Sequence, residues 1–309
     1  MKAFRLHVKM TVLALAMVVC IVVYDLVGFK TTEVKADQSQ TPVQYSFYNE
    51  GNGSFETQMC NTYVTVGNAT DLTMSEDRWY VFKGTVTIDN RVMVSGTANI
   101  ILMNGCVFTA SKGINVASGS ALNIYGQTIN GENETCGILE ASGDQFIAGI
   151  GGGIYESAGY IAINGGEVNS RGGAWAAGIG GGYQGAGGNI TITGGIVTST
   201  GGLGGAGIGG GDSGDGGRIT IIGGEVTANY GSGGAGIVGG SLGNGGCITI
   251  TGGEVRANAD AGGGAGIGGG SLGNGGSITI TGGMIKAIGG GVYITGGSFE
   301  NSYRISKNH

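Results

Sequence analysis

The chain has 309 residues and a formal net charge of −6, and it contains 72 glycines and one proline. Glycine at this level without a Gly-X-Y period excludes collagen, and the regular β-branched residues described below exclude a disordered chain. The first 36 residues carry five Lys or Arg and two Asp or Glu, so the remainder keeps 10 basic and 19 acidic side chains. This balance, a charge of −9, argues against nucleic acid as a partner.

Residues 1–36 have the pattern of a secretory signal peptide. Lys2, Arg5 and Lys9 precede an apolar stretch, and Val34-Lys35-Ala36 offers small residues for cleavage. We therefore predict a secreted or surface-displayed protein. An uncleaved N-terminal anchor is the alternative, and it is the one expected contact with a membrane.

Residues 37–78 are predicted to form a flexible leader and an N-terminal cap. Residues 37–50 are polar, whereas bulky apolar side chains gather around Tyr63 and Trp79. The open end of a solenoid exposes unpaired strand edges, so we expect aromatic side chains to cover it. Two shorter units follow, because Ser95-Gly96-Thr97-Ala98 returns 23 residues later as Ser118-Gly119-Ser120-Ala121, and residues 127–147 are predicted to form a side loop.

The rest of the chain repeats one phrase five times, AGIGGG followed by ITITGG. The Ala-Gly-Ile triplets and the Ile-x-Ile cores both step by 29, 29, 29 and 30 residues. The triplets start at Ala148, Ala177, Ala206, Ala235 and Ala265, and the cores at Ile161, Ile190, Ile219, Ile248 and Ile278. A fixed period in this range indicates a solenoid, a propeller or an array.

Each repeat is expected to hold three short strands. Ile190 and Ile192 alternate with threonine, and a β-branched residue follows at Val197. Ala177 to Ile179 would form the third strand, with Gly178 and Gly180 facing outward. A propeller blade needs four antiparallel strands, so we predict an all-β, single-domain, right-handed parallel β-helix.

The predicted helix has about eight coils. It spans residues 79–297, with a polar tail at 298–309. Its inward ladder is predicted to contain Ile192, Ile221, Ile250 and Ile280.

Trp79-Tyr80-Val81, Gly84-Thr85-Val86-Thr87-Ile88 and the AGIGGG/ITITGG repeats resemble secreted or cell-surface β-helix proteins of Gram-positive bacteria. These are similar in fold to the pectate-lyase-like superfamily, and the resemblance covers residues 79–297. That superfamily includes lyases, hydrolases, sugar-binding modules and inert spacers, so the resemblance implies a fold and leaves the activity open.

The histidine content argues against several kinds of catalysis. The chain has His7 and His309 alone, at its two extremes. Ser-His-Asp or Cys-His machinery and His-ligated metals are therefore not expected. The clustered Asp residues and Gly-His-Gly motif of the polygalacturonase-like enzymes are also missing. We predict no catalytic residue and no cofactor; a polysaccharide lyase or glycoside hydrolase is the alternative.

Two acidic pairs could bind a cation. Glu225 and Glu254 should face outward on adjacent coils about 5 Å apart and could share Ca²⁺. The alternative is a solvated ion-pair patch with Arg256 and Lys286. Asp212 and Asp215 lie in one turn and could add oxygen ligands, although aspartate is also a common turn residue.

Trp175 and Tyr183 flank one AGIGGG strand and are the predicted glycan contact, because aromatic rings stack on sugars. The alternative is that they cover a coil junction. We therefore predict a structural or adhesin-type module that binds polysaccharide, such as a host or cell-wall glycan, without cleaving it. An ice-binding surface built from the outward threonines is a second alternative. Cys60, Cys106, Cys136 and Cys247 allow three disulfide pairings, and the sequence does not choose among them.

Overall fold

The computed structural model describes residues 41–75, 77–128, 135–260 and 263–289. The predicted signal peptide, the last shortened coil and the polar tail lie outside these residues. The regular elements of the described residues are strands. No helix long and apolar enough to cross a membrane occurs in this part of the chain.

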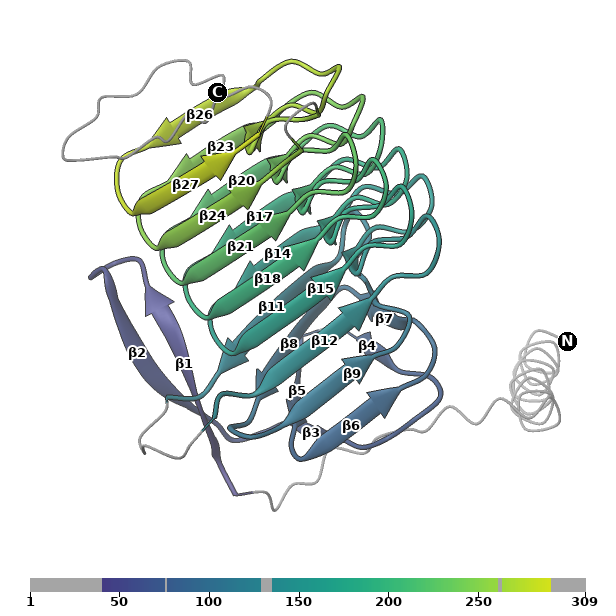
Figure 1. Ribbon diagram of the computed structural model, residues 1–309. Coiled ribbons are helices and arrows are strands. Elements are labelled where there is room, and N and C mark those ends of the chain that lie inside the picture. Colours follow the sequence, from purple (N-terminus) through teal and green to yellow (C-terminus); the bar gives the residue numbers. More distant parts are fainter. Residues whose placement is uncertain (1–40, 76, 129–134, 261–262, 290–309) are drawn as a thin grey trace, which may run out of the picture. The chain divides into compact units, whose positions relative to one another are not determined.

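Three parallel sheets, here sheets I, II and III, run the length of the described coils (Figure 1). Sheet I contains β4 (Thr73–Ser75), β7 (Val92–Ser95), β10 (Ile114–Asn115), β13 (Ile150–Gly151), β16 (Ile179–Gly180), β19 (Ile208–Gly209), β22 (Ile237–Val238) and β25 (Ile267–Gly268). Sheet II contains β3 (Val64–Val66), β5 (Arg78–Phe82), β8 (Thr97–Leu102), β11 (Ala121–Gly126), β14 (Tyr160–Ile163), β17 (Asn189–Ile192), β20 (Arg218–Ile221), β23 (Cys247–Ile250) and β26 (Ser277–Ile280). Sheet III contains β6 (Thr85–Ile88), β9 (Val107–Ala110), β12 (Ile138–Ser142), β15 (Glu167–Arg171), β18 (Ile196–Thr200), β21 (Glu225–Asn229), β24 (Glu254–Asn258) and β27 (Met284–Ile288).

Each coil gives one strand to each sheet, and eight such coils run from β4 to β27. The prediction of a right-handed parallel β-helix of about eight coils, with 29-residue repeats in its C-terminal half, is confirmed. The parallel pairing begins earlier than expected, since β3 and β4 lie in the segment predicted to be the cap.

The core is a set of stacked side-chain ladders. Ile192 pairs with Ile221, Ile221 with Ile250, and Ile250 with Ile280. All four are buried, and Ile250 has no exposed surface. Thr249 precedes Ile250 on the same strand and is half-buried on the outer face. The alternation of Ile and Thr therefore sets the inner and outer faces as predicted.

The AGIGGG segment differs from its expected form. The strand β16 is two residues long, and Gly178 and Gly180 are buried rather than outward-facing. A Cβ atom on Gly178 would lie 2.2 Å from Ser199 Oγ. The backbone turns sharply here, because Ala177 N–H donates to Gly181 O over 3.0 Å. Glycine is required by close approach to the neighbouring strand, which the repeat pattern alone did not reveal.

A hairpin of β1 (Val43–Asn49) and β2 (Ser54–Cys60) lies beside the coils and is purple in Figure 1. The Tyr45 ring packs 4.6 Å from Trp79 and 5.0 Å from Tyr125, between ring centroids. Trp79 and Tyr125 are outward residues of sheet II. These aromatic side chains thus pack on the outer face of the first coils. The hairpin buries its apolar face against the sheet here, and a cap of aromatic side chains over the open end stays a prediction.

Candidate functional site

Trp175 and Tyr183, the predicted glycan contact, come together on the loops that flank β16. Trp175 lies in the loop between β15 and β16, and Tyr183 in the loop between β16 and β17. Their ring centroids are 6.5 Å apart in an edge-to-face arrangement. The pair is close because each coil folds both loops back beside its two-residue strand in sheet I.

Two further aromatic residues complete the group, which we call the aromatic cluster: Phe146, Tyr155, Trp175 and Tyr183. The Tyr183 ring lies 5.6 Å from Phe146 and 5.7 Å from Tyr155. Tyr183 N–H also donates to Phe146 O over 2.9 Å, which ties one coil to the next. The sequence held a signal for Phe146, which stands 29 residues before Trp175 at the same repeat position. Tyr155 had no such signal.

The cluster is held in an unusual backbone conformation. Phe146 and Trp175 both have φ of +71°, and Tyr155 has φ of +63°. At the position of Phe146 and Trp175, the next two coils have Gly204 and Gly233, with φ of +76° and +85°. Bulky residues rarely adopt positive φ, and the conformation costs about 1–2 kcal/mol for a residue with a Cβ atom. Two coils therefore carry aromatic rings where glycine would fit without strain.

The aromatic cluster is partly open to solvent. Trp175 is 39% exposed and Tyr155 is 68% exposed, and the neighbouring Ile154 is 46% exposed. Phe146 and Tyr183 are half-buried beneath them. The side-chain amide of Gln184 donates to the Tyr183 hydroxyl over 3.3 Å. The cluster thus presents apolar ring surface beside a polar tip, which is the composition expected of a sugar contact.

A carboxylate lies next to Trp175 on the following coil. Asp212 N–H donates to Trp175 O over 2.8 Å, and the side chain is buried. Its carboxylate accepts a hydrogen bond from Ser213 Oγ at 3.2 Å. Burial raises the pKa of Asp212 above its ordinary value, and the Ser213 bond acts in the opposite direction. The sequence indicates Asp212, with Asp215, as an oxygen ligand or a turn residue, and the structure adds its contact with the Trp175 loop.

The loop that carries Tyr155 is fixed from the shorter coils below it. Arg91 donates through Nη2 to Gly151 O and Gly152 O, both over 2.9 Å. Glu156 Oε2 accepts from Gly153 N and from Asn115 Nδ2, at 2.9 and 3.2 Å. Burial lowers the pKa of Arg91 to about 10, while Glu156 and Asp144 act to raise it, so the guanidinium keeps its charge at neutral pH.

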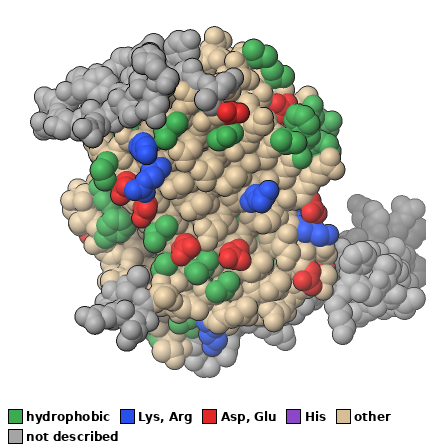
Figure 2. Space-filling view, viewed as in Figure 1, with side chains coloured by type: hydrophobic (Ala, Val, Ile, Leu, Met, Phe, Trp, Pro, Cys, Tyr) green, Lys and Arg blue, Asp and Glu red, His purple; other side chains and the backbone are tan. Residues whose placement is uncertain are grey.

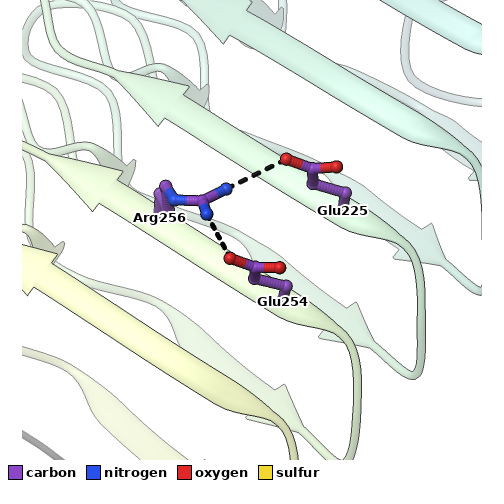
Figure 3. A network of polar contacts seen from close by, with 3 residues as sticks. All are labelled: Glu225, Glu254 and Arg256. Atoms are coloured by element: carbon purple, nitrogen blue, oxygen red, sulfur yellow. Dashed lines mark hydrogen bonds and ion pairs between the residues drawn. The ribbon is translucent and has the colours of Figure 1, made fainter.

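The second predicted pair, Glu225 and Glu254, also lies in register on adjacent strands. Arg256 sits between the two carboxylates and donates to both, 2.9 Å from Glu225 Oε1 and in contact with Glu254 Oε1 (Figure 3). Lys286 follows on the next strand, in register with Arg256. A Ca²⁺ ion shared by the glutamates would have to displace the guanidinium. The geometry is that of a partly exposed ion-pair group, worth ~0–1 kcal/mol per pair.

The other polar side chains of the described residues were compared with the requirements of a metal site and of a reactive thiol. Within the described ranges, no group of three or more His, Cys, Asp or Glu side chains is placed to hold a metal ion. The face of sheet III in Figure 2 is mostly backbone and uncharged side chains, with charges scattered across it. Cys60, Cys106, Cys136 and Cys247 are free thiols. Burial raises the pKa of Cys106 to about 11, so this thiol is unreactive at neutral pH.

The outward threonines of sheet II form the row on which the ice-binding alternative depends. Thr191, Thr220, Thr249 and Thr279 pair in register on four consecutive strands. The row stops at Ala162 on β14, and Ile222 interrupts the parallel row two residues further along. Thr193 in that second row is buried and donates to Asn164 Oδ1. The regular threonine array is therefore short, and ice binding stays the second alternative to polysaccharide binding.

Comparison with known proteins gives one finding. A family model described as a beta helix repeat matches residues 161–183, 190–212 and 248–271, and the first of these segments contains both Trp175 and Tyr183. No curated protein and no solved structure gave a significant match. The three matched segments and the three parallel sheets together support a place for this chain among the parallel β-helix proteins.

Proposed function

We propose that this chain is a secreted or surface-displayed β-helix module that binds polysaccharide through the aromatic cluster and does not cleave it. Secretion rests on the signal-like pattern of residues 1–36, and a surface role on the resemblance to Gram-positive surface proteins. The polymer would be a cell-wall or host glycan. The β-helix serves as a rigid support on which the loops beside sheet I present their side chains.

One observation carries the proposal: aromatic rings occupy the positive-φ positions of Phe146 and Trp175, where later coils have glycine. Strain of this kind persists where the side chain serves a purpose, and it is concentrated at binding sites. The same turn forms with glycine at Gly204 and Gly233, so the coil itself does not require an aromatic residue at this position. We therefore infer that the rings of Phe146 and Trp175 contact a ligand.

Binding without cleavage is supported by the groups near the cluster. Glycosidic cleavage needs a pair of positioned acid and base groups within hydrogen-bond reach of the scissile bond. Glu156 is held by Gly153 N and Asn115 Nδ2, and Asp212 is buried beside the Trp175 loop. The Glu156 carboxylate is thus engaged by structural partners and does not serve Asp212 as the second member of an acid–base pair. A weak single contact would still give strong attachment when many copies act at one surface.

The test replaces Trp175 by the residue of the later coils. Trp175→Gly removes about 1–2 kcal/mol of backbone strain. It also removes an aromatic pair worth about 0.5–1.5 kcal/mol. These two effects oppose each other, so the free energy of unfolding should change little. Binding of the full chain to soluble polysaccharides is measured by affinity gel electrophoresis. We expect Trp175→Gly to weaken binding about tenfold, which corresponds to about 1.4 kcal/mol.

The matched control is Tyr160→Asn. Tyr160 is also an exposed aromatic residue, and its partner on the next coil is Asn189. This variant should bind like the natural chain. Binding that persists unchanged in Trp175→Gly would remove the aromatic cluster as the site. Unsaturated products absorbing in the ultraviolet, or new reducing ends, would show instead that the protein is a lyase or a hydrolase.

A further inference from the structure

The ligand class can be narrowed by the charge around the aromatic cluster. Three consecutive coils carry the aromatic cluster and Asp212. Their loops beside sheet I span residues 143–159, 172–188 and 201–217. They contain four carboxylates, Asp144, Glu156, Asp212 and Asp215, and no Lys or Arg. Three arginines lie at or near the edges of these loops. Arg91 donates to the carbonyls of Gly151 and Gly152, while Arg171 at the end of β15 and Arg218 at the start of β20 are exposed.

Asp212 N–H donates to Trp175 O, which places this residue beside the tryptophan loop on the next coil. Gly204 occupies the position of Trp175 on the next coil, and a Cβ atom there would lie 2.6 Å from Asp212 Oδ1. The carboxylate thus fills the space that an aromatic side chain would take at residue 204. Asp212 stands 29 residues after Tyr183, at the same repeat position, and adjacent coils in a parallel stack are about 4.8 Å apart, so Asp212 takes the place of Tyr183 on the next coil.

The carboxylate keeps capacity for further hydrogen bonds. An ionised carboxylate accepts about four, and among the described residues Ser213 Oγ is the donor it has, at 3.2 Å. Burial raises the pKa of this group, a sign that the ionised form is poorly solvated in the free protein. Hydroxyl groups of a neighbouring sugar would supply the missing donors, whereas a second carboxylate would bring a like charge to the same place.

We propose that the aromatic cluster and Asp212 together form a site for neutral polysaccharides, built of uncharged hexose or N-acetylhexosamine units, and that the site rejects polyuronates. The sugar ring lies against Trp175 and Tyr183, and its hydroxyls donate to Asp212. This inference rests on the proposed function, because it names the ligand of the same site. The two coils after Asp212 have Ser241 and Ser271 at its repeat position, and glycine at the repeat position of Trp175. These coils therefore lack both the carboxylate and the aromatic ring of the proposed site.

The experiment compares neutral and acidic polymers on the full chain. A soluble β-glucan, a galactomannan and a chitin oligosaccharide are the neutral probes; polygalacturonate and alginate are the acidic ones. Each dissociation constant is measured by affinity electrophoresis or calorimetry at low and at physiological salt. We expect at least one neutral probe to bind at least tenfold more tightly than either polyuronate, with the difference larger at low salt, where like charges repel more strongly.

Two variants test Asp212 itself. Asp212→Ser introduces the residue found at Ser241 and Ser271, so the turn should fold, and neutral binding should fall about tenfold. Asp212→Asn keeps the shape and removes the charge, so the gap between neutral and acidic probes should narrow. Both variants are checked by circular dichroism for unchanged β-structure.

The outcomes separate this inference from the proposed function. If no polysaccharide binds, both fail. If polyuronates bind as tightly as neutral polymers, the proposed function stands and the neutral class is overturned. If Asp212→Ser binds neutral polymers like the natural chain, Asp212 is not part of the site.

Discussion

Replacing Ile250 by aspartate tests the central feature of the architecture, the stacked ladder inside the coils. Ile250 has no exposed surface and pairs with Ile221 and Ile280 on the flanking strands. Burial of an isoleucine side chain contributes ~1.5–3 kcal/mol, and an unpaired carboxylate in its place costs several kcal/mol more. The loss should therefore be at least ~4 kcal/mol, a large part of the ~5–15 kcal/mol that stabilises a folded domain.

The assay is thermal unfolding followed by circular dichroism. For a chain of this size, a loss of ~4 kcal/mol lowers the midpoint by about 8–16 °C. Thr249→Asp is the matched control, since it adds the same charge one residue away on the outer face of β23. A surface substitution changes stability by about 0.5 kcal/mol or less. Equal losses of midpoint in the two variants would refute the assignment of inner and outer faces.

Three other predictions use the same unfolding assay. Arg91→Ala should cost about 1–3 kcal/mol of folding free energy, because it removes two charge-assisted hydrogen bonds to Gly151 O and Gly152 O; an unchanged midpoint would speak against this anchoring role. Burial raises the pKa of Asp212 in the folded state. Asp212 therefore contributes fully to the free energy of unfolding below its ordinary pKa of 3.8, and this contribution is lost as the pH rises through the folded-state pKa. Asp212→Asn should therefore raise the midpoint at pH 7 relative to the natural chain and lose this advantage near pH 3; a constant difference across this range would contradict the shift. Gly178→Ala should be strongly destabilising, because its Cβ atom would lie 2.2 Å from Ser199 Oγ, whereas Gly67→Ala, with no atom within 4 Å, should be tolerated; equal effects would show that close approach is not the reason for Gly178.

Much of the candidate site could be anticipated from residue type and period. Trp175 and Tyr183 were identifiable because they are bulky aromatic residues in a Gly-rich repeat, and the structure brings their rings together. Phe146 could have been found by stepping back one period. Asp212 stands one period after Tyr183, but its contact with the Trp175 loop could not be read from the sequence. The place of Tyr155 could not be read either, because both depend on how loops of different coils fold back beside a two-residue strand.

Glu225 and Glu254 also show which features the sequence predicted and which depended on the tertiary structure. The repeat placed Glu225 and Glu254 side by side, and the strand register agrees. Whether the pair faces a cation or a side chain depended on the rotamer of Arg256, which donates to both. The hairpin gives a further example. Its first strand, β1, lies in residues predicted to form a flexible leader, and the surface it covers was decided by the outward Trp79 and Tyr125 of the first coils.

The sequence by itself determined the period, the three strands of each 29-residue coil, the inward ladder and the parallel stacking, whereas β12 formed within residues 127–147, which were predicted to be a side loop. The sequence could do so because a two-residue side-chain alternation repeated at constant spacing has one way to bury its apolar face. The tertiary structure alone decided the burial of Gly178 and Gly180, the aromatic cluster across two coils and the carboxylate beside Trp175. These features depend on distances between loops of neighbouring coils, and such distances follow from the packed backbone rather than from the order of residues in one repeat.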